Sequence, residues 1–294
     1  MNANAMTVDV EDYFQVEAFA STIDRAEWEY LPHRVERNTG LLLDMFADAG
    51  VNATFFVLGW IARRYPALVR RIVAEGHELA SHGCDHLRAD CQSPAAFRAD
   101  VRESKAVLEQ AGGVAVAGYR APTFSIGSGS DWAHGILAEE GYRYSSSVYP
   151  VKHDLYGTRG APRTAFVPVE GMVEIPLTTV RLNGVALPAS GGGYFRLFPY
   201  SMSRWLLAQA GRELGTPSIF YLHPWEVDPQ QPRQRHAPLR SRFRHYLNLN
   251  RTEKRLRRLL RDFAWTRMDR LFLSEGSEPF PVVTAWMDPR SPSP

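Results

Sequence analysis

Strand-like and helix-like segments alternate along about the first 220 residues of this 294-residue chain. Apolar runs rich in β-branched and aromatic residues, such as 52–58 and 219–222, are typical of buried strands. Amphipathic stretches such as 38–49 and 94–110 lie between them and are typical of helices. This alternation predicts an α/β fold on a parallel sheet, either a barrel or a doubly wound sheet. In a barrel the loops after the strands share one rim, so residues far apart in the sequence meet there.

The composition is that of a water-soluble globular protein, with 45% hydrophobic and 22% charged residues. The sequence contains no run of about 18 apolar residues, so we expect no transmembrane helix. The first six residues have no basic region and no apolar core, so they do not form a signal peptide. Two cysteines, Cys84 and Cys91, argue against a disulfide framework. We therefore expect a cytoplasmic protein.

Basic residues are concentrated late in the chain. Residues 233–270 hold 13 Lys and Arg against 3 Asp and Glu, whereas the whole chain holds 34 against 32. Such a segment favours contact with phosphate, an anionic sugar or a membrane surface. The alternative is a solvated helix face, and the sequence leaves both open.

Two histidines, His82 and His86, stand four residues apart in the motif SHGCDH, directly after the strand-like segment 77–80. This spacing puts both imidazoles on one side of a helical turn, within reach of one metal ion. Two imidazoles and a carboxylate are the ligands of catalytic zinc sites. Manganese, cobalt, nickel or iron can use the same set. Cys84 lies between the histidines, and we predict that it is a packed thiol.

Three carboxylates, Asp9, Glu11 and Asp12, close the first predicted strand. Charges directly after a buried strand are costly unless they are used, although a solvated turn is the alternative. We expect one carboxylate to bind a metal ion and another to take a proton from water. Asp9 and Glu11 share a face if the strand continues, whereas Asp12 turns inward if it ends at Val10.

Two further polar residues follow predicted strands. Arg120 comes after 114–118, and a guanidinium beside a carboxylate keeps that carboxylate ionised and oriented. His223 comes after 219–222 and is a candidate general acid. Glu226 or Asp228 would raise its pKa, because both lie close in sequence.

The order and spacing of these motifs resemble the NodB-type polysaccharide deacetylases, carbohydrate esterase family 4, over about residues 6–225. The segments that carry the resemblance are TVD at 7–9, SHGCDH at 81–86, RAP at 120–122 and LH at 222–223. The longer stretches 7–16, 191–196 and 221–228 resemble the branch associated with exosortase (PEP-CTERM) exopolysaccharide gene clusters.

The resemblance implies a distorted (β/α)7 barrel and a hydrolase of linear amide C–N bonds. The reaction would be metal-dependent N-deacetylation of N-acetylhexosamine units in a polysaccharide or its lipid-linked precursor. By the family pattern Asp9 is the base, His82 and His86 hold one divalent metal ion, Arg120 orients Asp9, and His223 is the acid. Zinc is the first choice of metal, with cobalt, nickel, manganese or iron as alternatives.

The chain departs from the family pattern at two positions. Val10 stands where most members have a metal-binding Asp, so the carboxylate ligand is either Glu11 or Asp12. The aromatic residue that usually follows Arg-x-Pro comes one position late, as Phe124 after Thr123. This shift affects the backbone N–H that the family uses to hold the oxyanion.

We divide the chain into a catalytic unit over 6–228, a basic helical extension packed on it over 229–287, and a disordered tail over 288–294. The predicted partner is an N-acetylated glycan and not a nucleic acid, and the basic extension suggests peripheral contact with a membrane or a lipid-linked glycan. Two alternatives stay open: a metal-free allantoinase-like amidohydrolase and a catalytically silent glycan-binding subunit. The residues predicted to contact sugar, with core packing as the alternative, are Tyr194, Phe195, Arg196 and Trp225.

Overall fold

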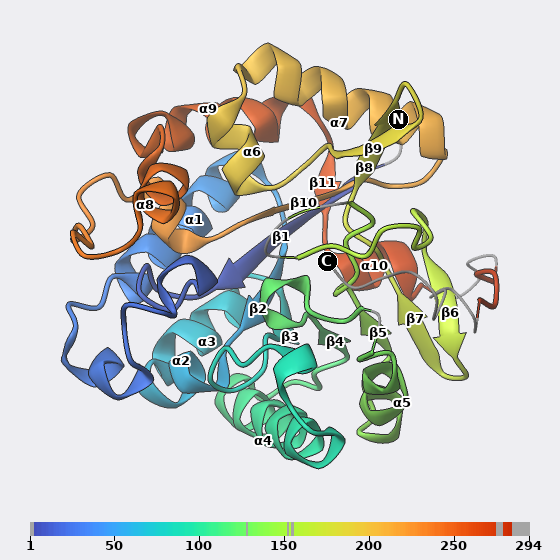
Figure 1. Cartoon of the computed structure of the whole chain (residues 1–294), viewed down its shortest axis with the longest axis horizontal. Helices are drawn as coiled ribbons and strands as arrows, with labels where there is room; N and C mark the ends of the chain where they lie inside the picture. The colour runs from blue at the N-terminus through green and yellow to red at the C-terminus, as the bar shows by residue number, and fades with distance from the viewer. Residues whose placement is uncertain (1–2, 128, 152, 154–155, 275–278, 284–294) are drawn as a thin grey trace.

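One curved sheet organises the chain (Figure 1). The computed structural model describes residues 3–127, 129–151, 153, 156–274 and 279–283, so the predicted tail lies outside the described residues. The strand order is β10-β1-β2-β3-β4-β5-β7-β6, and β11 also pairs with β1. Every pair is parallel except β6 with β7. The strands are β1 (Asn4–Val10), β2 (Thr54–Val57), β3 (Glu78–Ser81), β4 (Gly118–Tyr119), β5 (Tyr144–Ser145), β6 (Phe166–Val169), β7 (Met172–Glu174), β10 (Ile219–Leu222) and β11 (Trp265–Thr266).

Helices cover the outer face of this sheet, and their limits follow local sequence signals. One helix ends at Gly50, whose left-handed φ of 63° suits glycine. Another begins with Pro66, and a third is capped by the Ser93 hydroxyl, which accepts from the Ala96 N–H. The helices are α1 (Val35–Ala49), α2 (Gly59–Arg64), α3 (Pro66–Ala74), α4 (Pro94–Gly112), α5 (Trp132–Glu139), α6 (Gly192–Leu197), α7 (Tyr200–Leu214), α8 (Leu239–Tyr246), α9 (Leu249–Asp262) and α10 (Met268–Phe272).

The two faces of β1 have different neighbours, because side chains alternate along a strand. Val8 and Val10 belong to the main core under the helices. Thr7 and Asp9 are buried on the other face, where both accept hydrogen bonds from Arg120. The strand thereby delivers Asp9 to the inner side of the sheet.

The α/β class with a parallel sheet is as predicted. In the part of the chain that the structure describes, the edge strands β10 and β6 do not pair with each other, so no closed ladder forms. The closed barrel therefore stays a prediction. A separate hairpin of β8 (Thr179–Leu182) and β9 (Val185–Pro188) lies between β7 and α6 in the chain.

The late helices share the core of the earlier chain. Leu256, Leu259 and Leu260 of α9 and Trp265 of β11 belong to the main hydrophobic cluster. β11 also pairs with β1 in the main sheet. Among the described residues no separate core marks a boundary at 228/229, and the domain division stays a prediction. Among the described residues, no helix combines the length and the apolar character needed to cross a membrane.

Candidate active site

The predicted polar residues converge at the carboxyl edge of the sheet, at the base of one pocket of about 470 Å³. Asp9 and Glu11 come from the end of β1, His82 and His86 from the loop after β3, and His223 from the end of β10. All five line the pocket. Parallel pairing of β10, β1, β2 and β3 brings these distant segments to one edge.

Glu11, His82 and His86 form a buried cluster in which one ligand atom from each lies within 4.8 Å of the others. The Glu11 Oε2 atom lies 2.8 Å from His86 Nε2. The angles between the two groups do not suit a hydrogen bond, and Glu11 Oε2 accepts none from the described residues. The Arg120 carbonyl, 2.8 Å from His82 Nδ1, orients that ring and leaves Nε2 for the cluster. The donor set fits a divalent metal ion.

The two histidines do not lie on a helical turn, contrary to the prediction. Residues 82–88 form a loop, in which Gly83 has φ 78° and His86 has φ 53°. A Cβ at Gly83 would lie 2.9 Å from Asp100 Oδ2, so glycine is needed there for space as well as for conformation. The loop bends back and brings the imidazole centroids to 5.4 Å.

Asp12, the other carboxylate predicted as a ligand, is not part of this cluster. Its Oδ2 accepts from the N–H groups of Arg34 at 2.6 Å and Val35 at 2.9 Å, and its Oδ1 accepts from Tyr13 N–H at 2.8 Å. The carboxylate thus satisfies orphan donors at the start of α1. Burial raises the pKa of Asp12 to about 6, although these N–H groups oppose the shift.

Asp9 is held by Arg120, which is fully buried behind it. The guanidinium donates from Nη1 to Asp9 Oδ1 at 2.6 Å and to Thr7 Oγ1 at 2.8 Å. It also donates to the carbonyl and the hydroxyl of Ser146, both at 3.1 Å, and covers the Phe56 ring at 4.1 Å. This set fixes the Asp9 carboxylate and leaves its Oδ2 toward the pocket, 4.0 Å from His223 Nε2.

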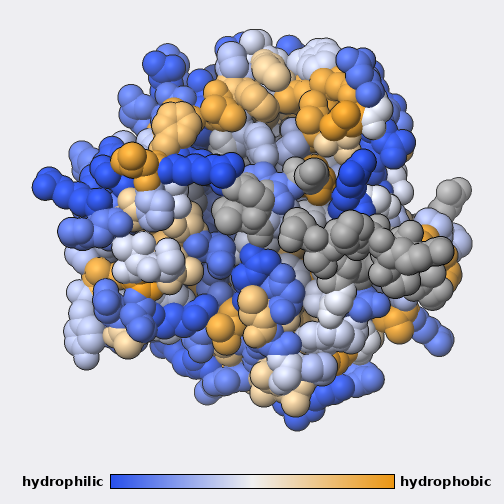
Figure 2. All heavy atoms as spheres, in the orientation of Figure 1, coloured by the Kyte–Doolittle hydropathy of each residue, from blue (hydrophilic) through white to orange (hydrophobic). Residues whose placement is uncertain are grey.

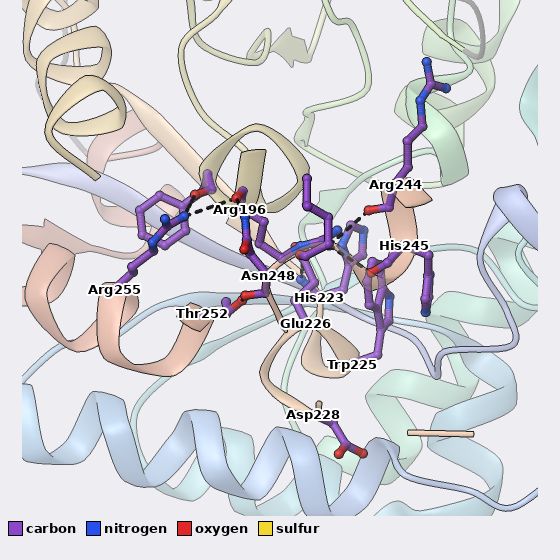
Figure 3. Close-up of polar contacts among 12 residues, drawn as sticks. Arg196, His223, Trp225, Glu226, Asp228, Arg244, His245, Asn248, Thr252 and Arg255 are labelled. Carbon is purple, nitrogen blue, oxygen red and sulfur yellow. Dashed lines mark hydrogen bonds and ion pairs between the residues drawn. The ribbon is translucent and has the colours of Figure 1, made fainter. Parts of the chain in front are cut away.

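His223 is held from behind by Glu226, which Arg196 holds in turn (Figure 3). Nδ1 of His223 lies 2.9 Å from Glu226 Oε1, and Arg196 Nε donates to Glu226 Oε2 at 2.6 Å. Asp228, the other predicted partner, lies instead beside Asn38, whose Nδ2 is 3.4 Å from its Oδ2. His223 Nε2 faces the pocket, 3.5 Å from Glu11 Oε1.

Three neighbouring groups share the charge at this corner, the buried Glu11 and Glu226 and the partly exposed His223. Burial alone would lower the pKa of His223, but the carboxylates of Glu11 and Glu226 raise it to about 9. Burial alone would raise the pKa of Glu226, but Arg196 and His223 lower it to about 2. Burial would likewise raise the pKa of Glu11, yet the charges on His86 and His223 lower it to about 2. The geometry therefore favours a protonated His223 that donates from Nε2 toward the pocket.

The four residues predicted to contact sugar have different surroundings in the structure. Tyr194 lines the pocket. Trp225 lines it too, but stacks on His223 at 5.2 Å between centroids and donates to Glu11 Oε1 at 3.2 Å. Phe195 packs in the core, edge-on to Phe220. The Arg196 side chain reaches the pocket wall, but its guanidinium is bonded within the protein.

Sequence reasoning missed why three glycines precede Tyr194. A Cβ at Gly192 would lie 1.9 Å from Glu226 Oε1, and Gly191 has φ 106° beneath the Tyr221 ring. The glycines let α6 approach the Glu226 carboxylate. The glycine run itself was visible in the sequence, but the carboxylate that it approaches was not.

The displaced aromatic of the Arg-x-Pro motif forms part of the pocket wall. Thr123 and Phe124 both have left-handed backbone conformations, with φ 58° and 50°. Phe124 packs on Tyr221 at 4.9 Å between centroids. Thr123 lines the pocket beside it, where its backbone turns sharply.

Comparisons with known proteins bear on this geometry. A family model described as polysaccharide deacetylase matches residues 17–145, which contain His82, His86 and Arg120. This first part of the chain is similar to the polysaccharide deacetylase family. A second model, described as a domain of unknown function (DUF3473), matches residues 146–273. The second matched part contributes His223, Glu226 and Arg196 to the same site.

Individual relatives of the deacetylase family resemble this chain over short spans. A chitooligosaccharide deacetylase of Rhizobium leguminosarum bv. trifolii is 43% identical over 73 residues, 25% of this chain and 34% of that protein. A peptidoglycan-N-acetylglucosamine deacetylase of Bacillus cereus is 33% identical over 72 residues, 24% of this chain and 34% of that protein. The chain thus spans about a third of the length of these curated relatives.

The fold has a solved counterpart in a candidate polysaccharide deacetylase from Mycobacterium smegmatis. The two structures superpose with a TM-score of 0.61 at 20% identity, over 96% of this chain and 93% of the other. Both halves of the chain therefore take part in one fold of the deacetylase type.

Proposed function

We propose that this protein is a metal-dependent deacetylase that removes acetyl groups from N-acetylhexosamine units of a glycan. The observation that carries the proposal is the convergence of Glu11, His82 and His86 with Asp9 and His223 at the base of one pocket. Hydrolysis of an acetamide needs an activated water, a base and an acid for the amine, and this corner contains groups suited to each task.

Glu11, His82 and His86 would hold the divalent metal ion. The ion would supply Lewis acidity at the acetamide carbonyl and lower the pKa of water. A set of two imidazoles and a carboxylate suits zinc, and also cobalt, nickel, manganese or iron. The proposal commits to one such ion.

The chain's own residues would move the protons. Asp9, held by Arg120, would take the proton of the attacking water at Oδ2. His223 would donate its Nε2 proton to the nitrogen of the breaking C–N bond, because an amine leaves poorly without protonation. Oδ2 and Nε2 lie 4.0 Å apart, so base and acid face the same small volume.

Aromatic rings around the pocket support a sugar substrate. Tyr156, Tyr194, Tyr221 and Phe243 line its walls. Rings of this kind stack on the apolar faces of sugars while tyrosine hydroxyls bond to sugar hydroxyls. The relatives act on chitooligosaccharide and on peptidoglycan N-acetylglucosamine, as their names state, and we propose a glycan of the same class for this chain. The resemblance to the exosortase-associated branch extends the proposal to exopolysaccharide biosynthesis.

Contact with a membrane or a lipid-linked glycan is a further part of the proposal. Apolar side chains gather on the upper rim of the face drawn in Figure 2, over α6 and α7. Leu197 of α6 and Trp205 of α7 are about half exposed, and Leu239 of α8 is 79% exposed. Several basic residues of α9 have partners inside the protein, however: Arg255 binds the carbonyl of Phe195. Co-sedimentation with anionic vesicles tests this part, with Leu239→Ser/Trp205→Ser as the variant and loss of binding as the expected result.

The decisive experiment measures bound metal and acetate release from N-acetylglucosamine oligomers on the same preparations. We expect about one equivalent of metal and acetate release in the wild type, and loss of both in His82→Ala. His236→Ala is the matched control, because His236 is exposed and lies outside the pocket. A wild type without metal would favour the metal-free amidohydrolase. Bound metal and glycan binding without turnover on any oligomer would favour the silent binding subunit.

A further inference from the structure

Arg196 joins two parts of the molecule that are distant in sequence (Figure 3). Its Nε donates to Glu226 Oε2 at 2.6 Å. Its Nη1 lies within hydrogen-bond distance of three backbone carbonyls where α8 turns into α9, those of Arg244 at 3.0 Å and of His245 and Leu247 at 2.9 Å. The side chain is 3% exposed. The Nε and Nη1 donors of this guanidinium therefore have their acceptors within the protein.

The α8–α9 turn is attached to α6 by return contacts as well. Asn248 Nδ2 donates to the Arg196 carbonyl at 2.8 Å. Arg255 of α9 donates from Nη1 to the carbonyls of Phe195 at 2.9 Å and Phe198 at 3.1 Å. Side chains of α9 thus bind the backbone of α6, while a side chain of α6 binds the backbone before α9. The turn and α6 therefore form one unit.

This unit reaches His223 by two paths. In the first, Glu226 Oε1 accepts from the His223 backbone N–H at 3.0 Å and contacts Nδ1 at 2.9 Å, while its other oxygen is bound by Arg196. In the second, the His245 ring stacks on Trp225 at 4.0 Å between centroids, and Trp225 stacks on His223. The first path contacts the Nδ1 edge of the His223 ring, and the second contacts its face.

We propose that Arg196 is a positioning residue, through which the α8–α9 turn holds Glu226 and so aims Nε2 of His223 into the pocket. The inference rests on the proposed function in one respect, namely that His223 acts as the acid. It assigns a task to the C-terminal helices: they complete the support of the acid. It also replaces the predicted role of Arg196 as a sugar contact.

A double-mutant cycle with Arg196→Met and Glu226→Gln tests the inference in kinetics. Each single variant is expected to lower kcat for acetate release about 10- to 100-fold with KM within about twofold, a range typical of groups that orient a reacting side chain. The double variant is expected to lose little more than the worse single variant, because both changes break one chain of contacts. Additive losses, or a rise in KM with unchanged kcat, would overturn the proposal.

Arg257→Met is the matched control. Arg257 is another arginine of α9, but it pairs with Asp48 and Glu253 instead of α6, and it does not line the pocket. It is expected to change kcat by less than about threefold. If Arg196→Met alone leaves a buried unpaired Glu226 that prevents folding, the double variant removes both charges together and remains measurable. A double variant with wild-type kcat would contradict the inference.

A spectroscopic measurement separates this inference from the proposed function. The Nδ1 proton of His223, if bonded to Glu226, gives a slowly exchanging downfield proton resonance in the wild type. We expect it to be lost in Glu226→Gln and lost or broadened in Arg196→Met, and retained in Arg257→Met. A wild type that shows this pattern but releases no acetate would refute the deacetylase and keep the positioning role. Retention of the resonance in Arg196→Met would refute the positioning role whatever the activity.

Discussion

Two buried arginine–carboxylate pairs flank the pocket, and they are attached to the protein differently. Arg120 meets Asp9 and Arg196 meets Glu226, each at 2.6 Å. Arg120 is anchored by groups of the sheet, including Thr7 and Ser146. Arg196 is anchored by carbonyls of the α8–α9 turn, far along the chain.

The carboxylates also face different neighbours. Asp9 turns its free oxygen into the pocket, whereas Glu226 turns its free oxygen to His223 Nδ1. The first pair therefore presents a group that can react, and the second pair supports one that can. The comparison teaches that similar contacts, from the two halves matched by different family models, serve direct and indirect roles.

Removing the charge of Asp9, the carboxylate of the first pair, has the largest expected effect. Asp9→Asn keeps a partner for Arg120 but removes the base, so kcat for acetate release is expected to fall about 10²- to 10⁴-fold. Metal content is expected to stay near that of the wild type, because Asp9 is not in the Glu11, His82 and His86 cluster. Acetate assays and metal analysis on one preparation check both. A modest loss of rate would place the base elsewhere.

Arg120→Met removes the guanidinium that holds Asp9 in the first pair. It leaves Asp9 buried without its charge partner, which is expected to cost about 3–5 kcal/mol in the free energy of unfolding. Urea unfolding of the variant and the wild type measures this. In Arg120→Met/Asp9→Asn much of the loss is expected to return, since no buried charge is left unpaired. Equal stability of Arg120→Met and wild type would show that the pair is not a structural anchor.

Glu226→Gln tests the indirect pair. The amide can still contact His223 but cannot stabilise its charge, so we expect a loss of about 10- to 100-fold in kcat, smaller than that of Asp9→Asn. Steady-state kinetics of the two variants side by side give the comparison. A loss as large as that of Asp9→Asn would mean that Glu226 has a direct role.

A buried carboxylate without an arginine sharpens the contrast. Glu78, at the opposite edge of the sheet, is bonded by the hydroxyls of Thr54 and Tyr144 and by the Asp269 N–H. Burial raises its pKa to about 7, whereas that of Glu226 is lowered to about 2. A raised pKa means that the folded state binds the proton more tightly than the unfolded state. The stability this supplies is full below about pH 4.5 and is lost as the pH rises through 7.

The expected size follows from that shift. Between pH 5 and pH 8 the free energy of unfolding of the wild type is expected to fall by roughly 2 kcal/mol relative to Glu78→Gln, which does not titrate. Urea unfolding at both pH values measures the difference. A constant difference across the range would show that Glu78 is ionised in the folded protein at both pH values.

The sequence by itself determined the strand-helix alternation, the parallel sheet and the residue types that follow each strand. It did so because side-chain periodicity and helix caps act within a few residues. Asp9, His82, Arg120 and His223 follow strands in the chain, so the topology alone brings them to one edge of the sheet. Their catalytic and metal-binding roles remain proposals.

Only the tertiary structure decided which partner each carboxylate and guanidinium binds. Asp12 lies one residue from Glu11, but the first N–H groups of α1 take its carboxylate, and Glu11 is left with the histidines. Arg196 was predicted to meet sugar, but carbonyls about 50 residues later take its guanidinium. Local sequence cannot specify such choices, because each depends on which distant backbone donor or acceptor the packing leaves unsatisfied.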